Sequence, residues 1–118
     1  MTPEILSRCM DAAMVRRNDL CLPGRLAPNL NQLQLEMMIA AFVAHPIYVE
    51  EFDGWTKKYR GALLHECVNI ALATRDAMVA GSKLVDFASK TVRELQEEIL
   101  RPAIEHFETE VQRHTGEA

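Results

Sequence analysis

Residues 30–44, LNQLQLEMMIAAFVA, are the most apolar stretch of the chain, and the rest of the sequence is best interpreted around them. The segment ends in an unbroken apolar run at 37–44, and Ala, Met and Leu all favour α-helix. At 100° per residue its apolar side chains point in almost every direction, and its polar residues all lie in its first half. A helix that is apolar on all sides is expected to be covered on all sides. We therefore expect a central helix here, packed against other helices or against a second copy of the chain.

The composition is typical of a soluble globular domain, with 48% hydrophobic and 25% charged residues among 118. No apolar run approaches the roughly 20 residues of a membrane span, and residues 1–17 lack the basic and long apolar segments of a signal peptide. Cys9, Cys21 and Cys67 form no C-x-x-C pair. The net charge of −4 disfavours non-specific binding to nucleic acid or to an anionic membrane. We expect a single helical domain over residues 1–118, located in the cytoplasm and binding no membrane.

Helical periodicity covers most of the remaining chain, which predicts an all-α fold, a bundle of four or five helices. Thr2-Pro3-Glu4 is a typical helix start, with an N-cap, a proline in the first turn and an acid near the positive end. Ser82 is a candidate N-cap for a later helix. Besides the central helix, the predicted helical segments cover residues 3–17, 46–60, 61–80, 83–100 and the stretch after Pro102.

Two positions leave the helix boundaries open. In residues 46–60 four aromatic side chains recur at helical spacing, and this register favours a continuous helix although Asp53-Gly54 is a turn signal. Pro102 cannot donate a hydrogen bond to the Glu98 carbonyl, so the C-terminal helix is expected to be kinked or broken there. After Pro102 the apolar stripe moves to a different face of the helix.

The apolar surface predicts self-association. Neither the central helix nor the stripe around Pro102 is expected to find complete cover inside so small a domain, and two such faces commonly close about a two-fold axis. The side chains predicted to form this interface are Leu100, Ile104, Phe107, Val111, Met38 and Phe42.

Two alternatives involve cationic residues. Lys57, Lys58 and Arg60 lie among aromatic residues, a pattern that can hold phosphates and stack bases, which suggests a nucleic-acid-binding regulator. Arg75 lies within the apolar arc of its helix and is a candidate contact for an anion or for a partner's carboxylate. A pocket near Arg75, with His65 as an acid or base, would indicate a small enzyme or ligand binder.

The motifs for specific chemistry are incomplete. His65-Glu66-Cys67-Val68-Asn69 matches the zinc motif H-E-x-x-H except that Asn, a poor zinc ligand, replaces the second His. No Glu-x-x-His pair and no glycine-rich phosphate loop occurs. We therefore predict no metal and no cofactor. The expected function is a non-enzymatic protein–protein interaction module, a homodimer.

Overall fold

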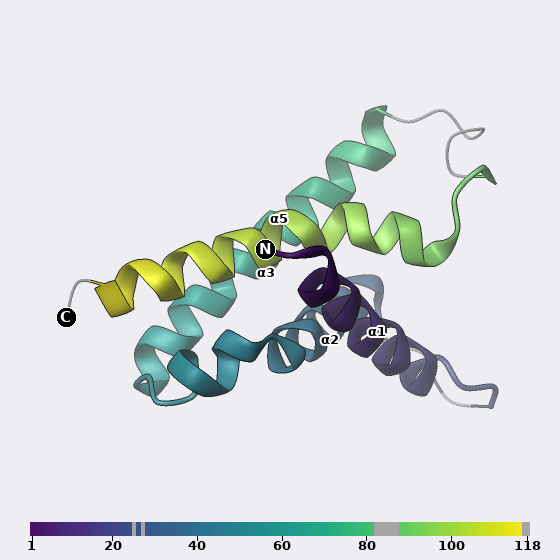
Figure 1. Cartoon of the computed structure of the whole chain (residues 1–118). Coiled ribbons are helices and arrows are strands. Elements are labelled where there is room, and N and C mark those ends of the chain that lie inside the picture. The colour runs from purple at the N-terminus through teal and green to yellow at the C-terminus, as the bar shows by residue number, and fades with distance from the viewer. Residues whose placement is uncertain (25, 27, 82–87, 117–118) are drawn as a thin grey trace.

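The computed structural model describes residues 1–24, 26, 28–81 and 88–116. These residues form helical elements only, which confirms the predicted all-α fold and the count of four or five helices (Figure 1). The elements are α1 (Pro3–Leu20), α2 (Leu30–Ala44), the short π-helix η1 (Tyr48–Phe52), α3 (Lys57–Gly81) and α5 (Val92–Gly116).

Side-chain caps start the first two helices. The Thr2 hydroxyl accepts a hydrogen bond from the Ile5 amide at 3.2 Å, and Pro3 occupies the first turn of α1. The Asn29 side chain accepts one from the Gln32 amide at 2.8 Å at the start of α2. α1 continues beyond the predicted end and stops at Leu20, and the two helices pack against each other. Local capping chemistry therefore placed both helix starts correctly.

The prediction of one continuous helix over residues 46–60 was wrong. The chain forms η1, turns at residues 53–55 and restarts as α3 at Lys57. The Trp55 amide donates to the Phe52 carbonyl at 3.0 Å, a turn contact, and Gly54 is a poor helix former. α3 then passes through Gly61 without interruption. The break therefore lies at the Asp53-Gly54 turn signal, which outweighed the aromatic register.

The predicted helix over residues 83–100 can be compared with the structure only from residue 88, and residues 89–91 interrupt it. Ser82 and residues 83–87 lie outside the described residues, and α5 starts at Val92. Its start is a capping box: the Glu94 amide donates to the Thr91 hydroxyl at 3.1 Å, and the Thr91 amide donates to the Glu94 carboxylate at 3.2 Å. At Pro102 the helix is kinked and not broken, since α5 continues to Gly116 and its course bends near the middle (Figure 1).

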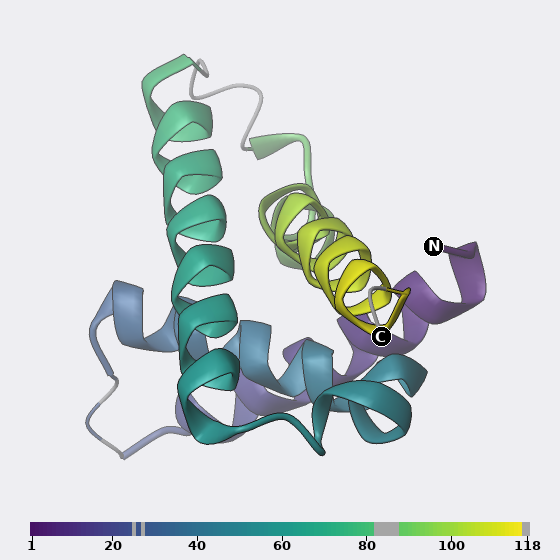
Figure 2. The same ribbon diagram turned by 90° about the vertical axis from the view of Figure 1, so that its left-hand side faces the viewer.

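The core lies where α2 and α5 meet, with α1, η1 and α3 around them (Figure 2). The Phe42 and Phe107 rings stack at 4.2 Å, and Phe52 packs edge-on against Phe107 at 5.0 Å. The sequence predicted that α2 is covered on all sides. It is not, because Leu30 is 75% exposed and Val43 is 49% exposed. A helix that is apolar on all sides therefore did not need other side chains of the chain packed against every side.

Candidate interaction surface

The six side chains predicted to form an interface lie inside the chain's own core. Each of them is 0% exposed: Leu100, Ile104, Phe107, Val111, Met38 and Phe42. This corrects the expectation that the stripe after Pro102 needed a second copy to cover it. The kink turns that stripe toward α2 and η1, so the two surfaces that seemed surplus cover each other. An interaction surface must be sought among other residues.

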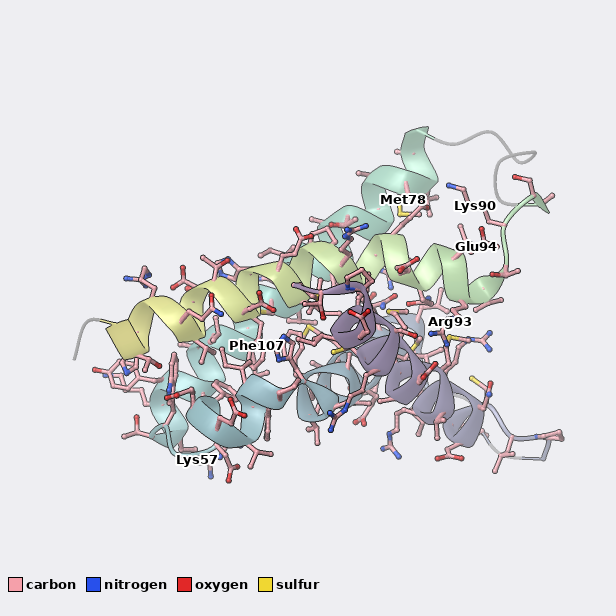
Figure 3. All side chains as sticks on the ribbon, viewed as in Figure 1. Lys57, Met78, Lys90, Arg93, Glu94 and Phe107 are labelled. Atoms are coloured by element: carbon pink, nitrogen blue, oxygen red, sulfur yellow. The ribbon has the colours of Figure 1, made fainter. Side chains whose placement is uncertain are left out.

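The cationic residues do not converge on one site. Lys57 and Lys58 are exposed at the start of α3, and Figure 3 shows Lys57 and Met78 at opposite ends of that helix. Arg60 donates to the Tyr48 hydroxyl at 2.9 Å, and its guanidinium carbon lies 5.5 Å from the centre of the Phe52 ring.

Arg75 lies far from that group, because fifteen residues of helix separate it from Arg60, roughly 22 Å at 1.5 Å per residue. Arg75 donates to the Asn31 side chain at 2.7 Å and to the Leu30 carbonyl at 3.4 Å, at the start of α2. It therefore ties α3 to α2, and its contacts are separate from those of His65, which lies within hydrogen-bonding distance of Asn69.

Exposed apolar side chains gather instead where the first half of α2 runs beside α3. We call this surface the α2–α3 face. Within it a groove of about 590 Å³ is lined by Asn29, Leu30, Asn31, Gln32, Leu35, Val68 and Leu72. Leu30 is 75% exposed, and Leu35, Val68 and Leu72 are half-buried. Further along α3, Val79 continues the apolar surface and is 62% exposed. The α2–α3 face thus consists of Leu30, Leu35, Val68, Leu72 and Val79.

Part of this face lies on a projecting arm. The last buried residue of α3 is Ala71, and the first of α5 is Ile99. We call residues 72–81 of α3 and 92–98 of α5 the arm, and the remaining described residues the body. Figures 1 and 2 show the end of α3 extending away from α1 and α2, whereas residues 92–98 contact both helices through Arg93, which donates to Asp11 at 2.6 Å, and Gln96, which accepts from Gln34 at 2.9 Å. The end of α3 is therefore the part of the arm that the body covers least.

The dimensions of the molecule agree with this description. Its radius of gyration is 14.8 Å, whereas a compact domain of this length has about 13.5 Å. The accessible surface is 7338 Å², whereas a compact monomer of the same mass exposes about 6,500 Å². The chain is therefore more extended than a compact monomer of its mass.

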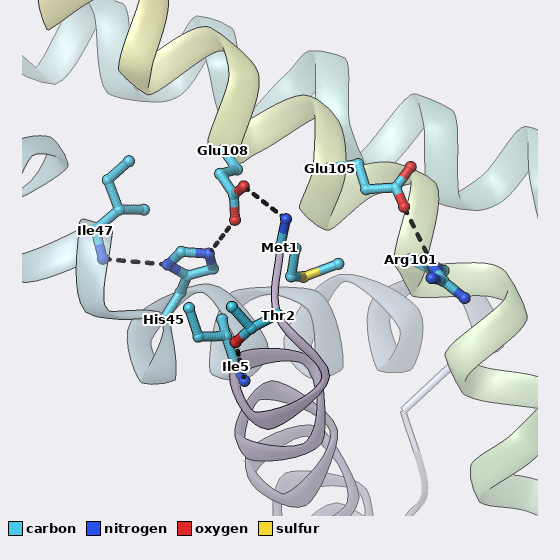
Figure 4. A network of polar contacts seen from close by, with 8 residues as sticks. All are labelled: Met1, Thr2, Ile5, His45, Ile47, Arg101, Glu105 and Glu108. Carbon is cyan, nitrogen blue, oxygen red and sulfur yellow. Dashed lines mark hydrogen bonds and ion pairs between the residues drawn. The ribbon is translucent and has the colours of Figure 1, made fainter.

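A buried polar cluster fixes the end of α2 opposite to this face. His45, which is 4% exposed, accepts a hydrogen bond from the Ile47 amide at Nδ1, at 3.1 Å (Figure 4). Its Nε2 therefore carries the proton and donates to the Glu108 carboxylate at 2.8 Å. The amino group of Met1 lies 3.2 Å from the same carboxylate. The sequence signal for this contact was only a histidine before a proline at a helix end.

The electrostatics of Glu108 follow from these contacts. Burial raises the pKa of the carboxyl, but the hydrogen bonds from His45 and from the Met1 amino group, together with the positive charge of that amino group, hold the pKa below its ordinary value of 4.5. The carboxylate is therefore ionised at neutral pH and joins α5 to the end of α2 and the start of α1. This arrangement supports a structural role for the cluster.

Burial also sets the protonation state of two of the cysteines. Burial raises the pKa of the Cys9 thiol to about 11 and that of the Cys67 thiol to about 12, so neither is a thiolate at neutral pH. No group of three or more His, Cys, Asp or Glu side chains suited to a metal ion occurs among the described residues. None of the helices described is long and apolar enough to cross a membrane.

Comparison with known proteins gives no relative from which a function could be inferred, so a proposal must rest on the fold and the surface. No protein-family model matches the sequence, and neither a curated protein nor a solved structure gives a match. The class that the structure defines is an all-α helical bundle with an exposed apolar face.

Proposed function

We propose that this chain is a non-enzymatic protein–protein interaction module that forms a homodimer through the α2–α3 face. The observation that carries the proposal is the exposed apolar surface of that face, together with an accessible surface larger than a compact monomer of this mass exposes. Removing apolar area from water favours association at about 25 cal/mol per Å² before the entropic cost of binding.

A second copy is the partner we propose because most soluble oligomers are homo-oligomers, and the two-fold dimer is the commonest. A two-fold contact of standard size would bury roughly 800 Å² of each chain. The proposal also retains a cytoplasmic location, which the three free cysteines support because unpaired thiols are typical of reducing compartments.

The test is the mass of the native protein in solution, measured by light scattering, with two matched variants. Wild type is expected at twice the chain mass of 13.4 kDa. Val79→Glu places a charge on the α2–α3 face and should give the mass of one chain, because burying an unpaired carboxylate in an interface is costly. Val49→Glu is the control, since Val49 is 72% exposed on η1, away from this face.

Circular dichroism should confirm that both variants keep the helical content of wild type. The proposal fails if wild type has the mass of a single chain at every concentration tested. It also fails if Val49→Glu separates the two chains and Val79→Glu leaves them together.

A further inference from the structure

We infer that the second copy docks antiparallel along α3, with Val68 of one chain against Val79 of the other and Leu72 against Arg75. This inference rests on the proposed function and adds the direction and register of the contact. It comes from the spacing of four residues on α3, from the charges beside them and from the groove that α2 forms next to them.

The four positions have the spacing of a helix-packing seam. Val68, Leu72, Arg75 and Val79 are separated by four, three and four residues, which is the a/d repeat of antiparallel and parallel helix pairs alike. At 100° per residue they fall within about 60° of one another on the helix surface. The seam lies beside the buried side of α3 and next to α2, where Val79 is 62% exposed and the other three side chains are half-buried.

The order of residue types along the seam is compatible with a two-fold axis. An axis perpendicular to α3 between residues 73 and 74 exchanges Val68 with Val79 and Leu72 with Arg75. Valine then meets valine at both ends of the contact. At the centre, the aliphatic stem of Arg75 packs on leucine while its guanidinium keeps its hydrogen bonds to Asn31 and Leu30 at the edge of the contact.

Charge distinguishes the two possible directions. A parallel pair places Arg75 against its own copy, and like charges in contact are destabilising. In the antiparallel pair, Asp76 of the second chain lies four residues, about 6 Å along the helix, from the residue opposite Arg75. The Asp76 side chain is 71% exposed and 3.4 Å from Arg75 of its own chain, so it is available at the rim. Opposed helix dipoles also favour the antiparallel direction.

The groove of the α2–α3 face gives the incoming helix a place to pack. Val68 and Leu72 form one side of the groove, and Leu30 and Leu35 of α2 form the other. In this register Val79 of the second chain lies opposite Val68 and enters the groove beside Leu30. The exposed Leu30 side chain is then covered, which accounts for a large apolar residue at the first position of α2.

Cross-linking between single cysteines tests the direction. The background is Cys21→Ser, because Cys21 is exposed whereas Cys9 and Cys67 are buried thiols with raised pKa values. Val68→Cys and Val79→Cys are made separately in this background. Each is treated with a short bismaleimide alone and as an equal mixture of the two, after exchange of chains and a check of helical content and native mass.

The inference predicts a covalent dimer in the mixture and in neither variant alone. A covalent dimer from Val79→Cys alone would indicate parallel helices and overturn the inference while the proposed homodimer stands. A native dimer that forms no cross-link in the mixture would place the interface elsewhere and would also overturn it. A single-chain mass for wild type would contradict the proposed function itself.

Discussion

The two halves of α5 differ in what they contribute. The second half supplies six buried side chains to the core, at Ile99, Leu100, Ala103, Ile104, Phe107 and Val111, whereas residues 92–98 supply none. α3 shows the same division, with buried residues only up to Ala71. Each long helix therefore has one part that supplies core side chains and one part, in the arm, that supplies none and contacts the body through polar side chains such as Arg75 and Arg93. A surface placed on the arm can change with little effect on the fold.

The largest effect should come from the body. Phe107→Ala removes a ring that stacks on Phe42 and packs against Phe52, and a cavity of this kind costs about 3–5 kcal/mol of unfolding free energy. Urea denaturation followed by circular dichroism measures the change. A loss below about 1 kcal/mol would mean that side-chain packing in the body does not supply most of the unfolding free energy.

The polar cluster should give the next effect, and its sign follows from the lowered pKa of Glu108. A carboxyl whose pKa is lower in the folded chain contributes stability above its ordinary value of 4.5, and this contribution is lost as the pH falls through the folded-state pKa. Glu108→Gln should cost about 1–3 kcal/mol at neutral pH, because the buried His45 loses a charged partner.

The measurement is the unfolding free energy of wild type and Glu108→Gln from neutral pH down to about pH 3, below the ordinary pKa values of Asp and Glu carboxyl groups. The difference between the two proteins should shrink as the pH falls. A constant difference across this range would contradict the assignment, since it would then not arise from ionisation of Glu108.

A smaller effect is expected where the arm begins. Thr91→Ala removes the hydroxyl that accepts from the Glu94 amide, and loss of an N-cap typically costs about 1 kcal/mol. Because residues 92–98 supply no core side chains, amide exchange should increase mainly in the first turns of α5 and little around Phe107. Equal acceleration along the whole helix would show that its two halves unfold together.

The smallest effect is expected at Val79. Val79→Ala should change the unfolding free energy of the single chain by less than about 0.5 kcal/mol, because exposed positions contribute little to stability. The comparison with Phe107→Ala is made in solutions dilute enough that light scattering gives the mass of one chain. A loss comparable to that of Phe107→Ala would remove the distinction between arm and body.

The sequence predicted local features well because they depend on neighbouring residues. Thr2 capped the helix it was expected to cap, the central helix covers residues 30–44 as predicted, and Pro102 kinked a helix whose apolar stripe changes face at that point. The all-α fold follows from the same helical periodicity.

Features that depend on which elements meet were not predictable from periodicity. A pattern shows that Phe42 and Phe107 lie on apolar faces, but it does not show that those two faces stack on each other. The predicted interface failed for this reason. The exposed Leu30 and Val79 became recognisable as a surface only once α2 and α3 were placed side by side.

Pro102 has a consequence for how α5 unfolds. A helix melts from its ends by losing hydrogen bonds in succession, each bond supporting the next. The bond that Pro102 cannot make belongs to the Glu98 carbonyl, the last residue of the arm before the buried half begins at Ile99. Unwinding that starts at Val92 therefore reaches a missing backbone hydrogen bond at the point where the buried part of α5 begins. The missing hydrogen bond at Pro102 therefore separates local unfolding of the arm from cooperative unfolding of the body.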